Sequence, residues 1–82
     1  GLVFVLKAVG QLKDLKKAQK VYEDARLFRN DLILGNVSIE TFIECGSLKK
    51  ARTIFNEMEA KDIVTWSKMI DGFVKFERYQ LA

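Results

Sequence analysis

The tetrapeptide Leu-Lys-Lys-Ala occurs twice, at residues 15–18 and 48–51, and each copy begins the same apolar pattern. After each leucine, apolar residues follow at offsets of 3, 6, 7 and 10, which places them on one face of an amphipathic helix. The two faces consist of Leu15, Ala18, Val21, Tyr22 and Ala25, and of Leu48, Ala51, Ile54, Phe55 and Met58. A chain that repeats one helix in this way is predicted to stack similar units.

A second pair of segments begins at Asp31 and Asp62, 31 residues apart. Apolar residues recur in both with helical spacing, which predicts helices over about 34–44 and 65–75. The pairs at this shift are Ile39 and Ile70, Phe42 and Phe73, and Ile43 and Val74. Short strands at 32–34 and 63–64 would fit the local residues, but the helical spacing continues beyond them.

The two kinds of helix alternate along the chain, beginning with a first helix over residues 3–9. Turns within the helix pairs are predicted at Gly10, at residues 45–47 and at residues 76–77. Asp14 and Ser47 directly precede the two Leu-Lys-Lys-Ala segments, where a side-chain oxygen can accept a hydrogen bond from an unpaired backbone N–H. We expect both to cap the helices that follow.

This order predicts an all-α solenoid of αα-hairpin repeats, because one hairpin cannot bury its own apolar faces. Repeat 1 spans residues 1–31, repeat 2 spans 32–62, and residues 63–82 form the first half of a third repeat. We expect the chain to be a fragment of a longer superhelix. Trp66 and Phe73 are predicted to be core residues. The central core is predicted to bury Leu48, Ala51, Ile54 and Phe55 against Val37, Phe42, Met69 and Ile70.

The composition argues against several classes of protein. Histidine is absent and cysteine occurs once, at Cys45, which removes the commonest general base and excludes a cysteine-based zinc site or an internal disulfide. The carboxylates are scattered, so no acid/base pair is visible. We therefore expect no enzyme activity, no metal, no cofactor and no small-molecule substrate. No apolar run of membrane-spanning length occurs.

The net charge of +3 is concentrated near the beginning of the chain. Residues 1–29 carry seven basic and three acidic side chains, which hints at a polyanionic partner. A solvated lysine face is the competing interpretation, and it is favoured for the lysine pairs at 16–17 and 49–50, which lie on the outward side of their helices.

Three segments carry a resemblance to a known family: Cys45-Gly-Ser-Leu, Ala51-Arg-Thr-Ile-Phe-Asn-Glu-Met and Asp62-Ile-Val-Thr-Trp-Ser. Together they resemble the pentatricopeptide repeat family, in its plant type that mixes repeats of different lengths. Repeat 1 is similar to the long variant and repeat 2 to the short, 31-residue variant. The tetratricopeptide repeat is the nearest alternative, but its Trp-x-x-Leu-Gly-x-x-Tyr opening does not fit the residues after Trp66.

The resemblance implies sequence-specific binding of single-stranded RNA in a mitochondrion or chloroplast, with one base read by each repeat. The protein would then act in the editing, splicing, stabilisation or translation of RNA. The alternative is a structural repeat that contacts other proteins of a large organellar ribonucleoprotein assembly. The sequence leaves open the target transcript, the organelle and the number of repeats in the whole protein.

In this family the fifth and last residues of a repeat set the base preference. In repeat 2 these are Asn36 and Asp62, a pair that implies a pyrimidine, uridine first. Both residues also have simpler interpretations, Asn36 as a polar residue at a helix start and Asp62 as an N-cap. Asp31, the last residue of repeat 1, has the same two interpretations. Repeat 1 has Val5 in the fifth position, where valine offers no hydrogen bond.

The remaining site residues follow from the same resemblance. Ser67 is the fifth residue of the third repeat and implies a purine. Ile33 and Val64 are the second residues of adjacent repeats and would clasp a base between them. Lys75 fits the place where a basic residue faces phosphate, whereas Glu44 occupies that place in repeat 2.

Overall fold

The computed structural model describes residues 2–25 and 31–81, and five helices account for most of them. The helices are α1 (Leu2–Leu12), α2 (Leu15–Ala25), α3 (Leu32–Glu44), α4 (Leu48–Glu57) and α5 (Ile63–Leu81). These two ranges contain no strand, and the prediction of an all-α repeat fold is confirmed. Among the helices of these ranges, none has the length and hydropathy that a membrane span requires.

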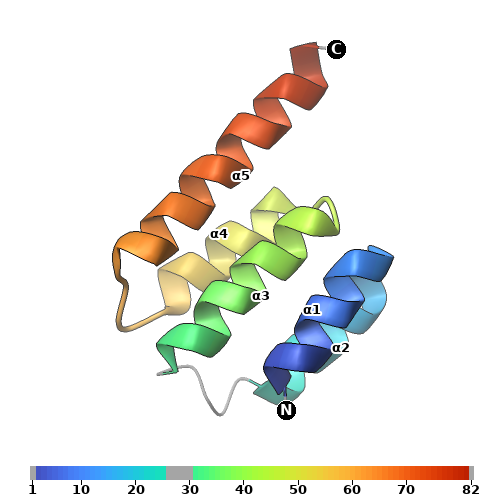
Figure 1. Ribbon diagram of the computed structural model, residues 1–82, viewed down its shortest axis with the longest axis vertical. Helices are drawn as coiled ribbons and strands as arrows, with labels where there is room; N and C mark the ends of the chain where they lie inside the picture. The colour runs from blue at the N-terminus through green and yellow to red at the C-terminus, as the bar shows by residue number, and fades with distance from the viewer. Residues whose placement is uncertain (1, 26–30, 82) are drawn as a thin grey trace.

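The helices form two layers. Helices α1, α3 and α5 make up the first layer, with α3 in contact with both of the others (Figure 1). Helix α2 packs against α1 and α4 packs against α3 to form the second layer. Because α2 also contacts α3, and α4 also contacts α5, each second-layer helix bridges two helices of the first layer. This arrangement buries the apolar face that one hairpin leaves open.

The turn between α3 and α4 is a Schellman motif built on Gly46. This residue has a φ of +83°, in the left-handed region that glycine adopts without steric cost. The Gly46 N–H donates to the Ile43 carbonyl at 3.0 Å, and the Ser47 N–H donates to the Phe42 carbonyl at 2.8 Å. Two carbonyls at the end of α3 are thereby satisfied.

The turn between α1 and α2 has the same hydrogen-bond pattern, but a lysine replaces the glycine. Lys13 has a φ of +55° and donates its N–H to the Gly10 carbonyl at 3.1 Å. The Asp14 N–H donates to the Val9 carbonyl at 3.3 Å. The two turns are therefore equivalent in structure although their sequences differ.

The residue that closes each turn also caps the next helix, as predicted. The Asp14 carboxylate accepts the Lys17 N–H at 3.1 Å, and the Ser47 hydroxyl oxygen accepts the Lys50 N–H at 3.3 Å. One residue thus serves the end of one helix and the start of the next.

The predicted turn at Gly10 is wrong, because α1 continues to Leu12. Gly10 instead lies where α1 packs closely on α3. A Cβ atom at this position would lie 3.4 Å from the Thr41 Cα and 2.5 Å from a Glu44 side-chain oxygen. The glycine allows helix contact here, which its sequence position alone did not reveal.

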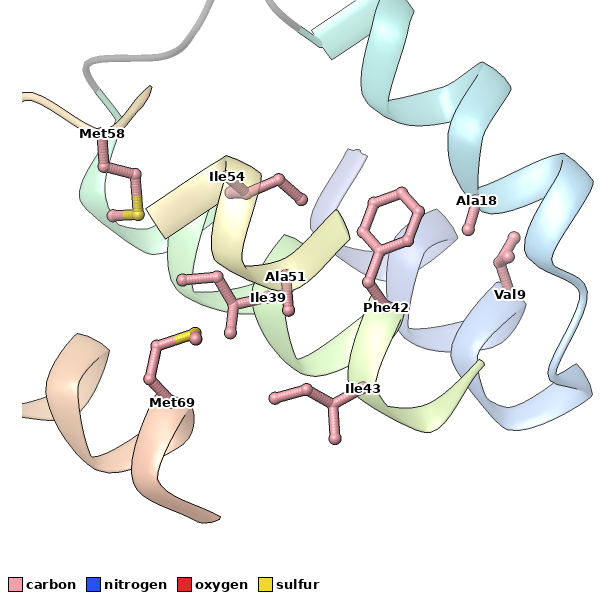
Figure 2. Packing of buried hydrophobic residues seen from close by; sticks show 9 residues of the cluster. All are labelled: Val9, Ala18, Ile39, Phe42, Ile43, Ala51, Ile54, Met58 and Met69. Atoms are coloured by element: carbon pink, nitrogen blue, oxygen red, sulfur yellow. The ribbon is translucent and has the colours of Figure 1, made fainter. Parts of the chain in front are cut away.

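The main core lies between the two layers and is centred on Phe42, which is fully buried (Figure 2). The Tyr22 ring contacts the Phe42 ring edge to face, with centroids 6.0 Å apart. Among the predicted core residues, Ala51, Ile54, Val37 and Met69 are buried with Phe42, whereas Leu48 and Phe55 are only half-buried.

Three predicted core residues lie on the exposed side of α5 instead. Ile70 is 58% exposed, Trp66 is 55% exposed and Phe73 is 42% exposed. Helix α5 packs with one face on α3 and α4, and nothing in the described part of the chain covers its other face. Trp66 packs edge to face against Phe55, with the ring centroids 4.8 Å apart.

The predicted turn at residues 76–77 is also wrong, because α5 runs without a break from Ile63 to Leu81. The two observed turns use a left-handed residue followed by a capping Asp or Ser. Glu77 and Arg78 stand at the positions that match Gly46 and Ser47, and neither residue type favours that role. The helix therefore continues.

Candidate nucleic-acid interface

Asp62 precedes α5 and caps it together with Thr65. The Asp62 carboxylate oxygen Oδ1 accepts the Thr65 N–H at 2.9 Å, and the Asp62 N–H donates to the Thr65 hydroxyl oxygen at 3.2 Å. This reciprocal pattern is a capping box, with threonine in place of the usual Glu or Gln. The predicted capping role of Asp62 is thus present in the structure.

Asn36, in the second turn of α3, reaches the same capping box. Its Nδ2 donates to Asp62 Oδ1 at 3.4 Å, and its Oδ1 accepts a hydrogen bond from the Thr65 hydroxyl. Asn36 is 7% exposed and Thr65 is fully buried. The structure therefore brings together the two residues that the sequence pairs, across the contact between α3 and α5.

The hydrogen bonds around Asp62 keep its carboxylate ionised. The Thr65 backbone N–H lowers the pKa of Asp62 most. Burial, the second-largest effect, raises it, and hydrogen bonds from the side chains of Thr65 and Asn36 and from the Val64 N–H lower it further. At neutral pH the cluster of Asn36, Asp62 and Thr65 thus combines one negative charge with an amide that can donate and accept.

Ile33 and Val64 lie in the first turns of α3 and α5. They are 66% and 46% exposed, so each presents an apolar surface to solvent. Such side chains can pack on the face of a base, which is the role that the family resemblance implies for them.

The junction between α1 and α3 has different chemistry. Asp31 caps α3 by accepting the Leu34 N–H at 3.1 Å. Val5 is half-exposed on α1, and Leu34 is buried at the position that matches Thr65. This junction therefore has the capping carboxylate but neither the amide nor the hydroxyl. Ser67, in the third repeat, is exposed on α5.

Lys75 is exposed and lines a groove of about 750 Å³ together with residues from the ends of α1, α3 and α5. Lys13 and Arg78 add positive charge to this groove, and Glu44 adds a negative charge. Nearby, Lys68 forms an ion pair with Glu40 at 2.8 Å, which joins α5 to α3. The groove is thus lined by side chains of both charges.

Cys45 also lines the groove, but its environment disfavours the thiolate. Burial raises the pKa of Cys45, and the carboxylates of Glu44 and Asp14 raise it further. The described ranges hold no group of three or more His, Cys, Asp or Glu side chains that could bind a metal ion.

The sequence patterns alone do not assign Thr65 to the site. The available signal was the spacing Asp62-x-x-Thr65, because a residue three positions after an N-cap can return a hydrogen bond to the cap. Its contact with Asn36 could not be read from spacing, because 29 residues separate the two.

The sequence profile of the pentatricopeptide repeat (PPR repeat) matches residues 39–63 and 64–82. The chain belongs to the pentatricopeptide repeat family. The match covers more than half of the chain and decides between this family and the tetratricopeptide alternative.

Three proteins of Arabidopsis thaliana illustrate the likeness, and all are named pentatricopeptide repeat-containing proteins. One mitochondrial protein is 38% identical over 52 residues, covering 63% of this chain and 8% of the relative. A second mitochondrial protein is 35% identical over 74 residues, covering 90% of this chain and 12% of the relative. A third, named chloroplastic/mitochondrial, is 33% identical over 81 residues, covering 96% of this chain and 13% of the relative. The chain thus spans only about an eighth or less of these relatives.

Proposed function

We propose that this chain binds single-stranded RNA in a sequence-specific way, with one base at each repeat, as part of a longer pentatricopeptide repeat array. The repeats span residues 1–31 and 32–62, and residues 63–82 form the first half of a third. The observation that carries this proposal is the contact between Asn36 and Asp62, two residues 26 positions apart that meet where α3 packs on α5. Family membership supports RNA binding in general terms.

The chemistry of the pair fits uracil. Uracil presents one N–H donor between two carbonyl acceptors. Asp62 accepts one of the two hydrogens on Asn36 Nδ2, which leaves the second for a base carbonyl, and the ionised Asp62 carboxylate can accept the base N–H directly or through water. Ile33 and Val64 supply exposed apolar surface on the two adjacent helices for the faces of the base.

The proposed role is binding rather than catalysis, in a mitochondrion or chloroplast, because the relatives carry those locations in their names. The RNA event served is editing, splicing, stabilisation or translation. The proposed partner is single-stranded RNA, with other proteins of an organellar ribonucleoprotein complex as further partners.

The test uses a longer repeat array that contains this chain, with and without Asn36→Thr, against short single-stranded RNAs that differ in one base. We expect the parent chain to prefer uridine at the Asn36 register, with a wrong base costing about 1–3 kcal/mol, the range for well-defined DNA sites. By the family's code, Asn36→Thr with Asp62 kept shifts the preference toward guanine. An equal loss of affinity for every RNA would contradict base reading.

Two observations favour the second candidate, a structural repeat that contacts proteins. The α1–α3 junction is apolar at Val5 and Leu34, and Glu44 stands where a phosphate-facing cation is usual in the family. If the chain shows no salt-dependent affinity for any single-stranded RNA, this scaffold role is the better explanation.

A further inference from the structure

We propose that Thr65 is a positioning residue for the Asn36–Asp62 pair, so that the base preference of repeat 2 depends on a side chain contributed by the following repeat. The inference rests on the proposed RNA binding. Thr65 is fully buried, so it acts on a base only through Asn36 and Asp62.

The Thr65 hydroxyl connects three groups. Its oxygen accepts the Asp62 N–H at 3.2 Å and lies 3.0 Å from Asp62 Oδ1, and its hydrogen bond to Asn36 Oδ1 joins α5 to α3. Asp62 Oδ1 already accepts the Thr65 N–H and a hydrogen from Asn36 Nδ2. Asn36 Oδ1 is therefore the partner that most needs the single hydroxyl hydrogen.

This hydrogen bond and the Asp62 carboxylate together select one orientation of the Asn36 amide. With Oδ1 toward Thr65, Nδ2 faces the Asp62 carboxylate and donates to it. Rotating the amide by half a turn would place Oδ1 at about the position of Nδ2, opposite the negatively charged Asp62 Oδ1. Two acceptors would then face each other, and the contact would become repulsive. The donor offered to the base consequently has a defined position.

The other junction of the chain supports this relation by contrast. Leu34 takes the place of Thr65 there, and Val5 takes the place of Asn36. The hydroxyl and the amide are thus replaced together by apolar side chains, while the capping carboxylate of Asp31 remains. Asp31 caps its helix without a threonine at this position, so capping alone does not explain the Thr65 hydroxyl. The contact of this hydroxyl with the Asn36 amide does.

The experiment uses nuclear magnetic resonance on the 82-residue chain, with Thr65→Val as the nearly isosteric variant that lacks the hydroxyl. Without RNA, we expect Thr65→Val to move the Asn36 side-chain amide resonances, because the amide loses its hydrogen bond from the Thr65 hydroxyl. With homopolymers of U, C, A and G, which have no register, the preference for U over the other bases should fall by about fivefold, the effect of losing one hydrogen bond. Thr65→Ser keeps the hydroxyl and should restore the preference to within about twofold.

Thr41→Val is the matched control. Thr41 is also buried, and its hydroxyl donates to the Leu6 carbonyl at 3.0 Å between α3 and α1, where it does not touch the Asn36–Asp62 pair. We expect Thr41→Val to lower the melting temperature while the base preference and the Asn36 resonances stay unchanged. If Thr65→Val and Thr41→Val lower the affinity for all four homopolymers by the same factor, Thr65 is only structural and the inference is wrong.

The outcomes separate this inference from the proposed function. Selective RNA binding that survives Thr65→Val would overturn the positioning role alone. Absence of binding by the parent chain would overturn both. Should Thr65→Val fail to fold, the parent chain still tests the contact, because a hydrogen-bonded Thr65 hydroxyl proton exchanges slowly with water, and rapid exchange would contradict the proposal.

Discussion

Lys13 and Gly46 occupy the same place in two equivalent turns, and both have a positive φ, +55° for the lysine and +83° for the glycine. The glycine adopts this conformation without cost, whereas a side chain at Lys13 is strained by about 1 kcal/mol or more. The turn thus keeps the same conformation in both repeats, although lysine is an unfavourable residue for it in repeat 1.

We therefore expect Lys13→Gly to stabilise the chain by up to about 1 kcal/mol, measured as the free energy of unfolding in urea. Gly46→Ala is the matched opposite change, and it should destabilise by about the same amount. Nothing lies within 4 Å of a Cβ atom at Gly46, so its effect reports backbone conformation alone. A destabilising Lys13→Gly would show that the lysine side chain contributes more than its strain costs.

The low pKa of Asp62 makes stability depend on pH in the acidic range. Its folded-state pKa lies below the ordinary value of 3.8, so its contribution to stability is present above that value and is lost as the pH falls through the folded-state pKa. We expect the difference in unfolding free energy between the parent and Asp62→Asn to be constant above about pH 5 and to shrink toward lower pH. Urea denaturation at a series of pH values measures it. A difference that grows on acidification would contradict the assignment.

Cys45 should react slowly with alkylating reagents. Burial and the nearby carboxylates raise the pKa of its thiol, so less thiolate is present at pH 8 than in an unfolded chain. Glu44→Gln removes one of these carboxylates and should speed alkylation, whereas Glu59→Gln, in the exposed segment before α5, should not. Rates of iodoacetamide labelling between pH 7 and about 10 test this. Equal rates for folded and denatured chains would contradict it.

Aromatic residues that differ in burial should differ in how much stability is lost when each is replaced by alanine. Phe42 is fully buried at the centre of the main cluster, so Phe42→Ala should cost about 3–5 kcal/mol of stability. Phe55 is half-buried, in contact with Trp66 and beneath the Lys61 ammonium at 5.1 Å from its ring centre, and Phe55→Ala should cost clearly less. Ile70→Ala, on the exposed face of α5, serves as the control and should have little effect. Equal losses at Phe42 and Phe55 would contradict this placement of the core.

Lys75 allows a test of phosphate contact that is separate from base reading. If Lys75 neutralises one phosphate, Lys75→Ala should weaken binding to all RNA sequences by the same factor. It should also reduce the slope of log affinity against log salt by about 0.7, the value for a single-stranded phosphate contact. Lys49→Ala, on the second-layer helix α4, should change neither quantity. A loss confined to one RNA sequence would assign Lys75 to base contact instead.

The sequence alone determined the helical class, the pairing of helices and the caps at Asp14 and Ser47. These features depend on residues close together in the chain, because apolar spacing and N-cap chemistry act within one or two helical turns. The same local logic explains the failures at Gly10 and at residues 76–77. Glycine inside a helix resembles a turn signal until its packing partner is known, and a turn requires a left-handed residue and a cap that α5 does not supply.

Only the tertiary structure decided which apolar residues are buried and how the candidate site is assembled. Ile39 and Ile70 match in sequence, yet Ile39 is buried between neighbouring helices and Ile70 faces outward from α5. In the same way, the capping box of Asp62 and Thr65 was readable from spacing, but its hydrogen bonds to Asn36 were not. Asn36 lies 26 positions from Asp62 and 29 positions from Thr65. The hydrogen bonds form because α3 and α5 pack side by side. Burial and long-range hydrogen bonds depend on which helix lies next to which, and that is a property of the packed fold rather than of any local pattern.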